Sequence, residues 1–100
     1  MKTLGIFVTS DRFPDYALLL ARAAIERGLR VWIHLSGSAV RLIGRAEFKT
    51  LAAADQVKIC RRSAALFEME ERLEIQRPDL LVPPQQMGRM IAMCDRHLFL

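Results

Sequence analysis

The sequence has few cysteines, few aromatic residues and no long apolar segment, and each shortage excludes a class of protein. Its 100 residues include two cysteines, one tryptophan and one tyrosine. Two distant cysteines indicate free thiols in a reducing compartment rather than a disulfide framework. No apolar run approaches the length that crosses a bilayer. A single tryptophan and a single tyrosine provide no series of rings on which nucleic-acid bases could stack.

Positive charge is in excess but is not concentrated. The chain has 15 lysines and arginines against 11 acidic residues, a net charge of +4. These basic residues form no dense tract, and no zinc-finger spacing is present, so we expect a solvated basic surface and no nucleic-acid partner. The first apolar run, residues 4–8, is too short for a signal peptide and is followed by Asp11 and Arg12. We therefore expect a cytoplasmic protein without a membrane span.

Short apolar runs alternate with helical patterns along the chain. The sequence predicts strands at 3–8, 30–35, 56–60, 80–82 and 95–100. It predicts helices at 16–27, 39–43, 46–54, 63–71 and 84–94, the first capped by Asp15 and ended by Gly28. Residues 68–78 have no clear period and are expected to be irregular. The alternation predicts a single α/β domain over residues 1–100, with three layers and helices on both faces of a mostly parallel sheet of about five strands.

Polar and reactive residues follow three of the predicted strands where each one ends. Ser10 and Asp11 follow the first strand, the turn 36–38 follows the second, and Cys60 closes the third. Because ligands of open parallel sheets bind beyond the carboxyl ends of the strands, we expect these residues to gather at one edge.

The stretch VKICRRSAA contains the main candidate, Cys60. It lies near the expected start of a helix, beside Arg61 and Arg62, and both features favour the nucleophilic thiolate form of a cysteine. The alternative is that Cys60 packs as a small apolar residue, since free cysteines are among the most buried residue types. The C-x-x-S pattern of this stretch is a weak signal, because a thioredoxin-like order of elements is missing.

The remaining cysteine and a histidine have simpler interpretations. Cys94 shares a helix face with Met87, Met90 and Ile91, which predicts core packing. His34 lies within an apolar strand and is expected to pack or to form a hydrogen bond. We expect no metal site, because zinc sites need three or four protein ligands. No cofactor is expected, since the sequence has neither a P-loop nor a G-x-G-x-x-G motif.

Three segments resemble the DsrE/DsrF-like proteins of sulfur relay. GIFVTSDRFPDYALLLARAAIERGLRVWIHLSGSAV is similar to the opening of that family, although Ser38-Ala39-Val40 stands where Gly-Val is usual. VKICRRSAA resembles the segment in which relay members carry their cysteine, and CDRHLFL resembles the closing strand. The charged segment 68–78 departs from the family, in which a short glycine-containing turn is frequent.

The resemblance implies a three-layer α/β fold and assembly into dimers, trimers or hexamers, or with related subunits. It implies that Cys60 accepts sulfur as a persulfide and passes it to a partner, as in a persulfide-forming sulfurtransferase subunit. Sulfur donor and acceptor proteins would be the partners. The residues expected to shape the pocket or stabilise the anion are Ser10, Asp11, Ser36, Arg61, Arg62 and Ser63. The alternative is a non-catalytic oligomeric binding module, with Cys60 structural and a small anion or metabolite at the strand ends.

Overall fold

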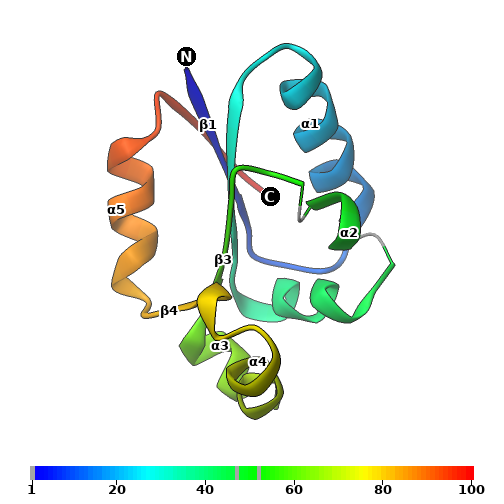
Figure 1. The fold of residues 1–100 in the computed structure, drawn as a ribbon, viewed down its shortest axis with the longest axis vertical. Coiled ribbons are helices and arrows are strands. Elements are labelled where there is room, and N and C mark those ends of the chain that lie inside the picture. The colour runs from blue at the N-terminus through cyan, green and yellow to red at the C-terminus, as the bar shows by residue number, and fades with distance from the viewer. Residues whose placement is uncertain (1, 47, 52) are drawn as a thin grey trace.

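A sheet of five parallel strands, in the order β4-β3-β2-β1-β5, forms the centre of the molecule (Figure 1). The computed structural model describes residues 2–46, 48–51 and 53–100. The strands are β1 (Thr3–Val8), β2 (Arg30–Leu35), β3 (Gln56–Cys60), β4 (Leu81–Val82) and β5 (Arg96–Phe99). The predicted α/β class is confirmed, and the expected strands agree with the structure to within one residue at every end.

In the part of the chain that the structure describes, five α-helices and two 3₁₀ segments connect the strands. They are α1 (Pro14–Glu26), η1 (Gly37–Gly44), α2 (Phe48–Leu51), α3 (Arg61–Leu66), α4 (Glu70–Gln76), η2 (Pro78–Leu80) and α5 (Gln85–Met93). Of the helix expected at 46–54, positions 47 and 52 lie outside the described residues.

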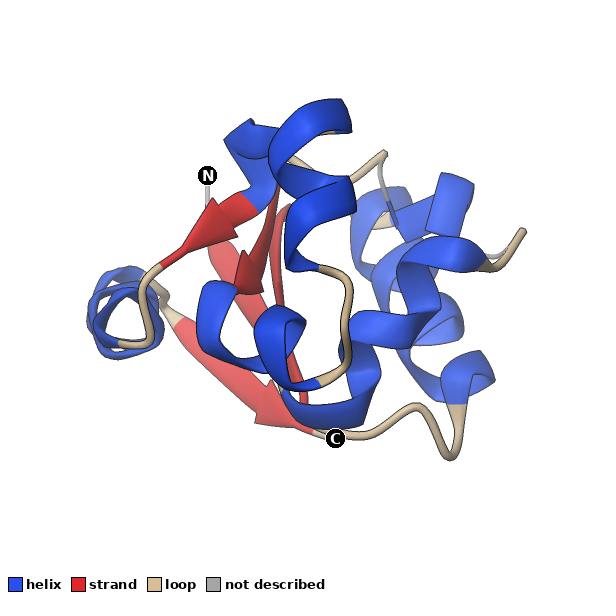
Figure 2. Ribbon diagram, turned by 90° about the horizontal axis from the view of Figure 1, so that it is seen from below, coloured by secondary structure: helices blue, strands red, loops and turns tan. Residues whose placement is uncertain are grey.

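The direction of the crossings places the helices on the two faces of the sheet. Each connection from β1 to β2, β3 and β4 leads to the next strand in the same direction across the sheet. Right-handed connections therefore place the helical segments between them on one face, namely α1, η1, α2, α3 and α4. The crossing from β4 to β5 runs back across the sheet and carries α5 over the other face. Figures 1 and 2 show α5 alone on its side of the sheet, opposite the other helices. We call these the multi-helix face and the α5 face.

Alternation along the strands decides which side chains each face receives. Ile6, Ile33 and Ile59 belong to the large core cluster under the multi-helix face. On the α5 face, Phe7 and Trp32 pack against Met90 of α5, with Met87, Ile91 and Cys94 at the margin. The predicted packing of Cys94 with the methionines is confirmed. Full burial of each large apolar side chain stabilises the fold by roughly 1.5–3 kcal/mol.

Helix α1 begins earlier than the sequence predicts. Asp15 was expected to be its N-cap, but Pro14 is already the first helical residue, and Phe13 precedes it without a side-chain cap. Proline suits the first turn because its φ angle is fixed near the helical value and its missing N–H needs no partner there. The other end agrees with the prediction. Gly28 has a φ of 78° and donates its N–H to the carbonyl oxygen of Ile25 at 3.0 Å.

The expectation of an irregular segment at 68–78 is wrong, because α4 occupies most of it. The helix expected at 63–71 instead starts at Arg61 and ends at Leu66. Glu68, with a left-handed φ of 58°, turns the chain between the two helices. Within α4 only Leu73 is buried among the residues described. A single apolar anchor in seven residues gives no helical period, which explains why the sequence pattern missed this helix.

Candidate functional site

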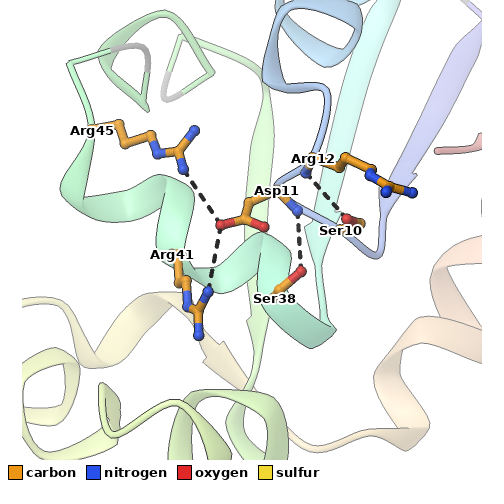
Figure 3. Close-up of polar contacts among 6 residues, drawn as sticks. All are labelled: Ser10, Asp11, Arg12, Ser38, Arg41 and Arg45. Carbon is orange, nitrogen blue, oxygen red and sulfur yellow. Dashed lines mark hydrogen bonds and ion pairs between the residues drawn. The ribbon is translucent and has the colours of Figure 1, made fainter.

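The loops after β1 and β2 meet at the carboxyl edge of the sheet. The backbone N–H of Asp11 donates to Oγ of Ser38 at 3.2 Å, and the N–H of Arg12 donates to Oγ of Ser10 at 3.1 Å (Figure 3). Both hydroxyls therefore satisfy backbone donors of the β1 loop. The structure brings Ser10, Asp11 and the 36–38 turn together.

The carboxylate of Asp11 lies between two arginines at the end of η1. Its Oδ2 atom is 3.4 Å from Nη2 of Arg45 and 4.0 Å from Nη1 of Arg41 (Figure 3). The guanidinium of Arg41 also lies over the ring of Phe67, 4.6 Å from its centroid. Both arginine side chains are about half exposed, so each ion pair contributes at most about 1 kcal/mol. Asp11 thus pairs weakly with two half-exposed arginines at the carboxyl edge of the sheet.

Gly37 connects the loop after β2 to the loop after β1 and to the start of α3. Its φ is 56°, and a Cβ atom at this position would lie 2.6 Å from the carbonyl oxygen of Thr9. Its N–H donates to Oγ of Ser63 at 2.9 Å, and Ser63 is buried in the first turn of α3. Glycine is needed here because only a residue without a side chain tolerates both the left-handed backbone and the close approach.

Ser36, another predicted site residue, acts through its backbone. Its N–H donates to the carbonyl oxygen of Val8 at 2.9 Å, and its own carbonyl accepts from the N–H of Ala39 at 3.1 Å. It is the N-cap residue of η1, but its hydroxyl makes no capping hydrogen bond. Ser36 therefore extends the β1–β2 pairing by one step and starts η1.

Cys60 is the last residue of β3 and directly precedes α3. It is a free cysteine, 6% exposed, and its backbone lies opposite Val82 of β4. Because Ile59 packs in the core of the multi-helix face, alternation directs the side chain of Cys60 to the α5 face. Cys60 thus shares the carboxyl edge with the serine loops but presents its sulfur toward the side covered by α5.

The two arginines after Cys60 differ in their surroundings. Nη1 of Arg61 lies 2.6 Å from Oε2 of Glu74 in α4, so this guanidinium is engaged by a carboxylate. Arg62 is exposed, and no ion pair of its side chain is found in the described part of the chain. Arg62 is therefore the cation of this pair that is available to a negatively charged partner.

His34 is the buried polar residue that the sequence reasoning did not connect to the site. It is 1% exposed, and neither ring nitrogen has a hydrogen-bond partner among the residues described. Its ring centroid lies 6.1 Å from that of Phe7. Burial lowers the pKa of His34 from 6.5 to about 4, so the ring is neutral at neutral pH. Leaving such groups unpaired costs about 1–3 kcal/mol each. The feature of the sequence that could have pointed to His34 is that a titratable residue lies within a strand whose flanking residues are apolar.

A hollow of about 280 Å³ lies at the other end of β3, next to Asp55, Lys58 and Arg77. All four of its charged residues have partners, and Oδ2 of Asp55 accepts from the backbone N–H of Val31 at 2.7 Å. Lys58 Nζ donates to the carbonyl oxygen of Asp79, and Arg77 pairs with the Asp79 carboxylate. This hollow is built from the amino end of the strand and does not include the residues predicted for the site.

No protein-family model matches the chain, and no curated protein matches it in sequence. Among the described helices, none combines the length and apolar character that a bilayer crossing needs. Nor do three His, Cys, Asp or Glu side chains gather as metal ligands anywhere in 2–46, 48–51 or 53–100.

Proposed function

We propose that this protein is a cytoplasmic sulfur-carrier subunit that accepts sulfane sulfur on Cys60 as a persulfide and passes it to a partner protein. The observation that carries the proposal is the position of Cys60, a free thiol at the end of β3 and immediately before α3. The positive charge of the exposed Arg62, two residues after Cys60, supports a sulfur anion there. The resemblance of VKICRRSAA to the cysteine segment of relay proteins supports the same role.

The reaction needs no external oxidant or reductant. The thiolate of Cys60 attacks the outer sulfur of a donor persulfide, a new S–S bond forms, and the donor thiolate leaves with the electron pair of the broken bond. In the second half, the thiolate of an acceptor protein attacks the outer sulfur on Cys60. The Cys60 thiolate is then released and the cycle is complete.

Predicted site residues and three residues that were not predicted, Ser38, Arg41 and Arg45, support this chemistry from the same edge. The bonds of Ser10, Ser38 and Ser63 hold the loops beside the start of α3. Arg41 and Arg45, paired with Asp11, add positive charge that attracts an anionic donor. Assembly with further copies or with related subunits would place a partner surface over this edge.

A second candidate is a non-catalytic binding module in which Cys60 is structural. The observation that favours it is the burial of Cys60, which is 6% exposed, together with the pairing of Arg61 to Glu74. In that case the Arg41–Asp11–Arg45 group would hold a small anion or metabolite at the strand ends. Calorimetry with inorganic phosphate on the native protein and Arg45→Ala measures this binding directly.

Intact-mass spectrometry after incubation with glutathione persulfide tests the carrier proposal. We expect a gain of one sulfur atom in the native protein and in Cys94→Ser, and no gain in Cys60→Ser. Cys94 is a matched control because it is the other free cysteine, half-buried directly after α5, and its pKa is raised by burial and by Asp95. A native protein that gains no sulfur, and whose Cys60 resists iodoacetamide while folded, would support the binding module instead.

A further inference from the structure

His34 and Cys60 emerge from the same face of the sheet on neighbouring strands. His34 of β2 is paired with Lys58 of β3, and Cys60 lies two residues beyond Lys58 on that strand. Residues two apart in a strand share a face, so the imidazole and the thiol both lie on the α5 face, toward its carboxyl end. The sequence positions, 34 and 60, give no hint of this juxtaposition, which arises from the register of two parallel strands.

The state of the imidazole suits it to bind a sulfur anion. A neutral imidazole has one N–H donor and one acceptor nitrogen, and neither nitrogen of His34 has a partner in the described part of the chain. The ring is 1% exposed and lies near Phe7, so water does not compete for the donor. A buried polar group without a partner requires an explanation. One explanation is that its partner is a ligand atom that is present during only part of a functional cycle.

On the basis of the proposed function, we propose that His34 donates its ring N–H to the outer sulfur of the persulfide carried by Cys60. That sulfur lies one S–S bond, about 2.05 Å, beyond the thiol sulfur and can extend farther across the α5 face. Hydrogen bonds to an ionised acceptor are stronger than those between neutral groups, especially where the dielectric constant is low. The bond would keep the sulfur on Cys60 until an acceptor thiolate attacks it.

The hydrogen bond from His34 does not alter the balance of atoms and electrons in the sulfur transfer. His34 keeps its proton throughout and contributes a hydrogen bond while the outer sulfur is negatively charged. When an acceptor thiolate attacks that sulfur, the S–S bond breaks and the Cys60 thiolate leaves with its electron pair. The acceptor departs with the sulfur, and the ring of His34 returns to the unpartnered state seen in the structure.

The lifetime of the loaded protein tests the proposal. The native protein, His34→Phe, His34→Gln and Trp32→Phe are loaded with glutathione persulfide, freed of donor and followed by intact mass. We expect His34→Phe to lose sulfur about tenfold faster, as expected for one hydrogen bond to a charged group. His34→Gln, which keeps an N–H donor, should lose sulfur at nearly the native rate. Trp32→Phe changes another large side chain of β2 on the same face and should behave as the native protein.

Three outcomes would overturn the inference. Equal sulfur lifetimes in the native protein and His34→Phe would exclude the hydrogen bond. Equally shortened lifetimes in His34→Phe and Trp32→Phe would assign the effect to packing. No uptake of sulfur by the native protein would remove the proposed function itself, and the inference with it. Nitrogen-15 NMR of the native protein adds a test that does not depend on the folding of variants: the ring-nitrogen shifts of His34 should change on loading, and an unchanged spectrum would contradict the proposal.

Discussion

The hydroxyl of Ser63 accepts a 2.9 Å hydrogen bond from the backbone N–H of Gly37, which joins the start of α3 to the turn after β2. Ser63 is buried, and the two residues come from different crossings of the sheet. This bond fixes the distance between the Cys60 segment and the serine loops, and so determines the shape of the carboxyl edge.

Ser63→Ala should therefore destabilise the protein by about 1–3 kcal/mol, because the Gly37 N–H loses its acceptor in a part-buried position. Urea unfolding followed by circular dichroism measures the change. Ser10→Ala is the matched control. It removes a similar hydroxyl-to-backbone bond that is exposed, so the expected change is within about 0.5 kcal/mol. Equal losses of unfolding free energy in the two variants would mean that the Ser63 hydrogen bond stabilises the fold no more than the exposed one.

Gly37→Ala should destabilise the protein by about 2 kcal/mol or more. The new Cβ would clash with the carbonyl oxygen of Thr9, and alanine would have to adopt the left-handed φ of 56°. The same unfolding assay measures it. Gly44→Ala provides the comparison, because a Cβ at Gly44 meets nothing within 4 Å. A Gly37→Ala protein as stable as Gly44→Ala would contradict the close approach of the two loops.

Glu68→Gly should stabilise the protein by about 0.5–1 kcal/mol. Glu68 has a φ of 58° in the turn between α3 and α4, a conformation that costs a residue with a side chain about 1–2 kcal/mol, and the entropy of glycine offsets part of the gain. Glu70→Gly, in the first turn of α4, should instead destabilise by up to about 1 kcal/mol. Thermal unfolding of both variants checks the opposite signs, and a loss of stability in Glu68→Gly would count against the left-handed turn.

Acid should weaken the fold through His34. Its pKa is about 4 in the folded protein and 6.5 when exposed, so the unfolded chain binds the proton more readily. This stability is fully present above pH 6.5 and is lost as the pH falls toward 4, by about 3 kcal/mol in total. The measurement is the free energy of unfolding from pH 7.5 to 4 for the native protein and His34→Phe. Their difference isolates His34 from the carboxylates, and parallel curves would show that its burial has no such effect.

The sequence pattern located the sheet well because its strands are short, mainly apolar segments bounded by turn residues. Thr3–Val8, Arg30–Leu35 and Gln56–Cys60 were all expected at the residues where they occur. Helix α4 was missed because one buried leucine, Leu73, anchors it. The reversal of direction after β4, which leaves α5 alone on its face, follows from tertiary packing that no local pattern encodes.

The candidate site was likewise predictable where it depends on strand ends and unpredictable where it depends on tertiary packing. The serine loops and Cys60 were expected at one edge, since the carboxyl ends of parallel strands coincide there. The pairing of Arg61 with Glu74 was not foreseen, because Glu74 lies in the helix that the pattern missed. The relation of His34 to Cys60 depends on strand register and on which face each side chain takes. A shift of one residue in the β2–β3 register would have turned one of them to the opposite face.

The placement of β5 beside β1 has a consequence for how the chain folds. Leu4 pairs with Arg96, so two segments separated by nearly the whole chain must find one another. Closing so large a loop is entropically expensive, and such contacts slow folding. Strands β1 to β4 can pair successively through shorter crossings, whereas β1 keeps one edge unpaired until β5 arrives. During that interval the open edge of β1 is available for pairing with another molecule, and once β5 has docked it is β5 that forms this exposed edge of the sheet.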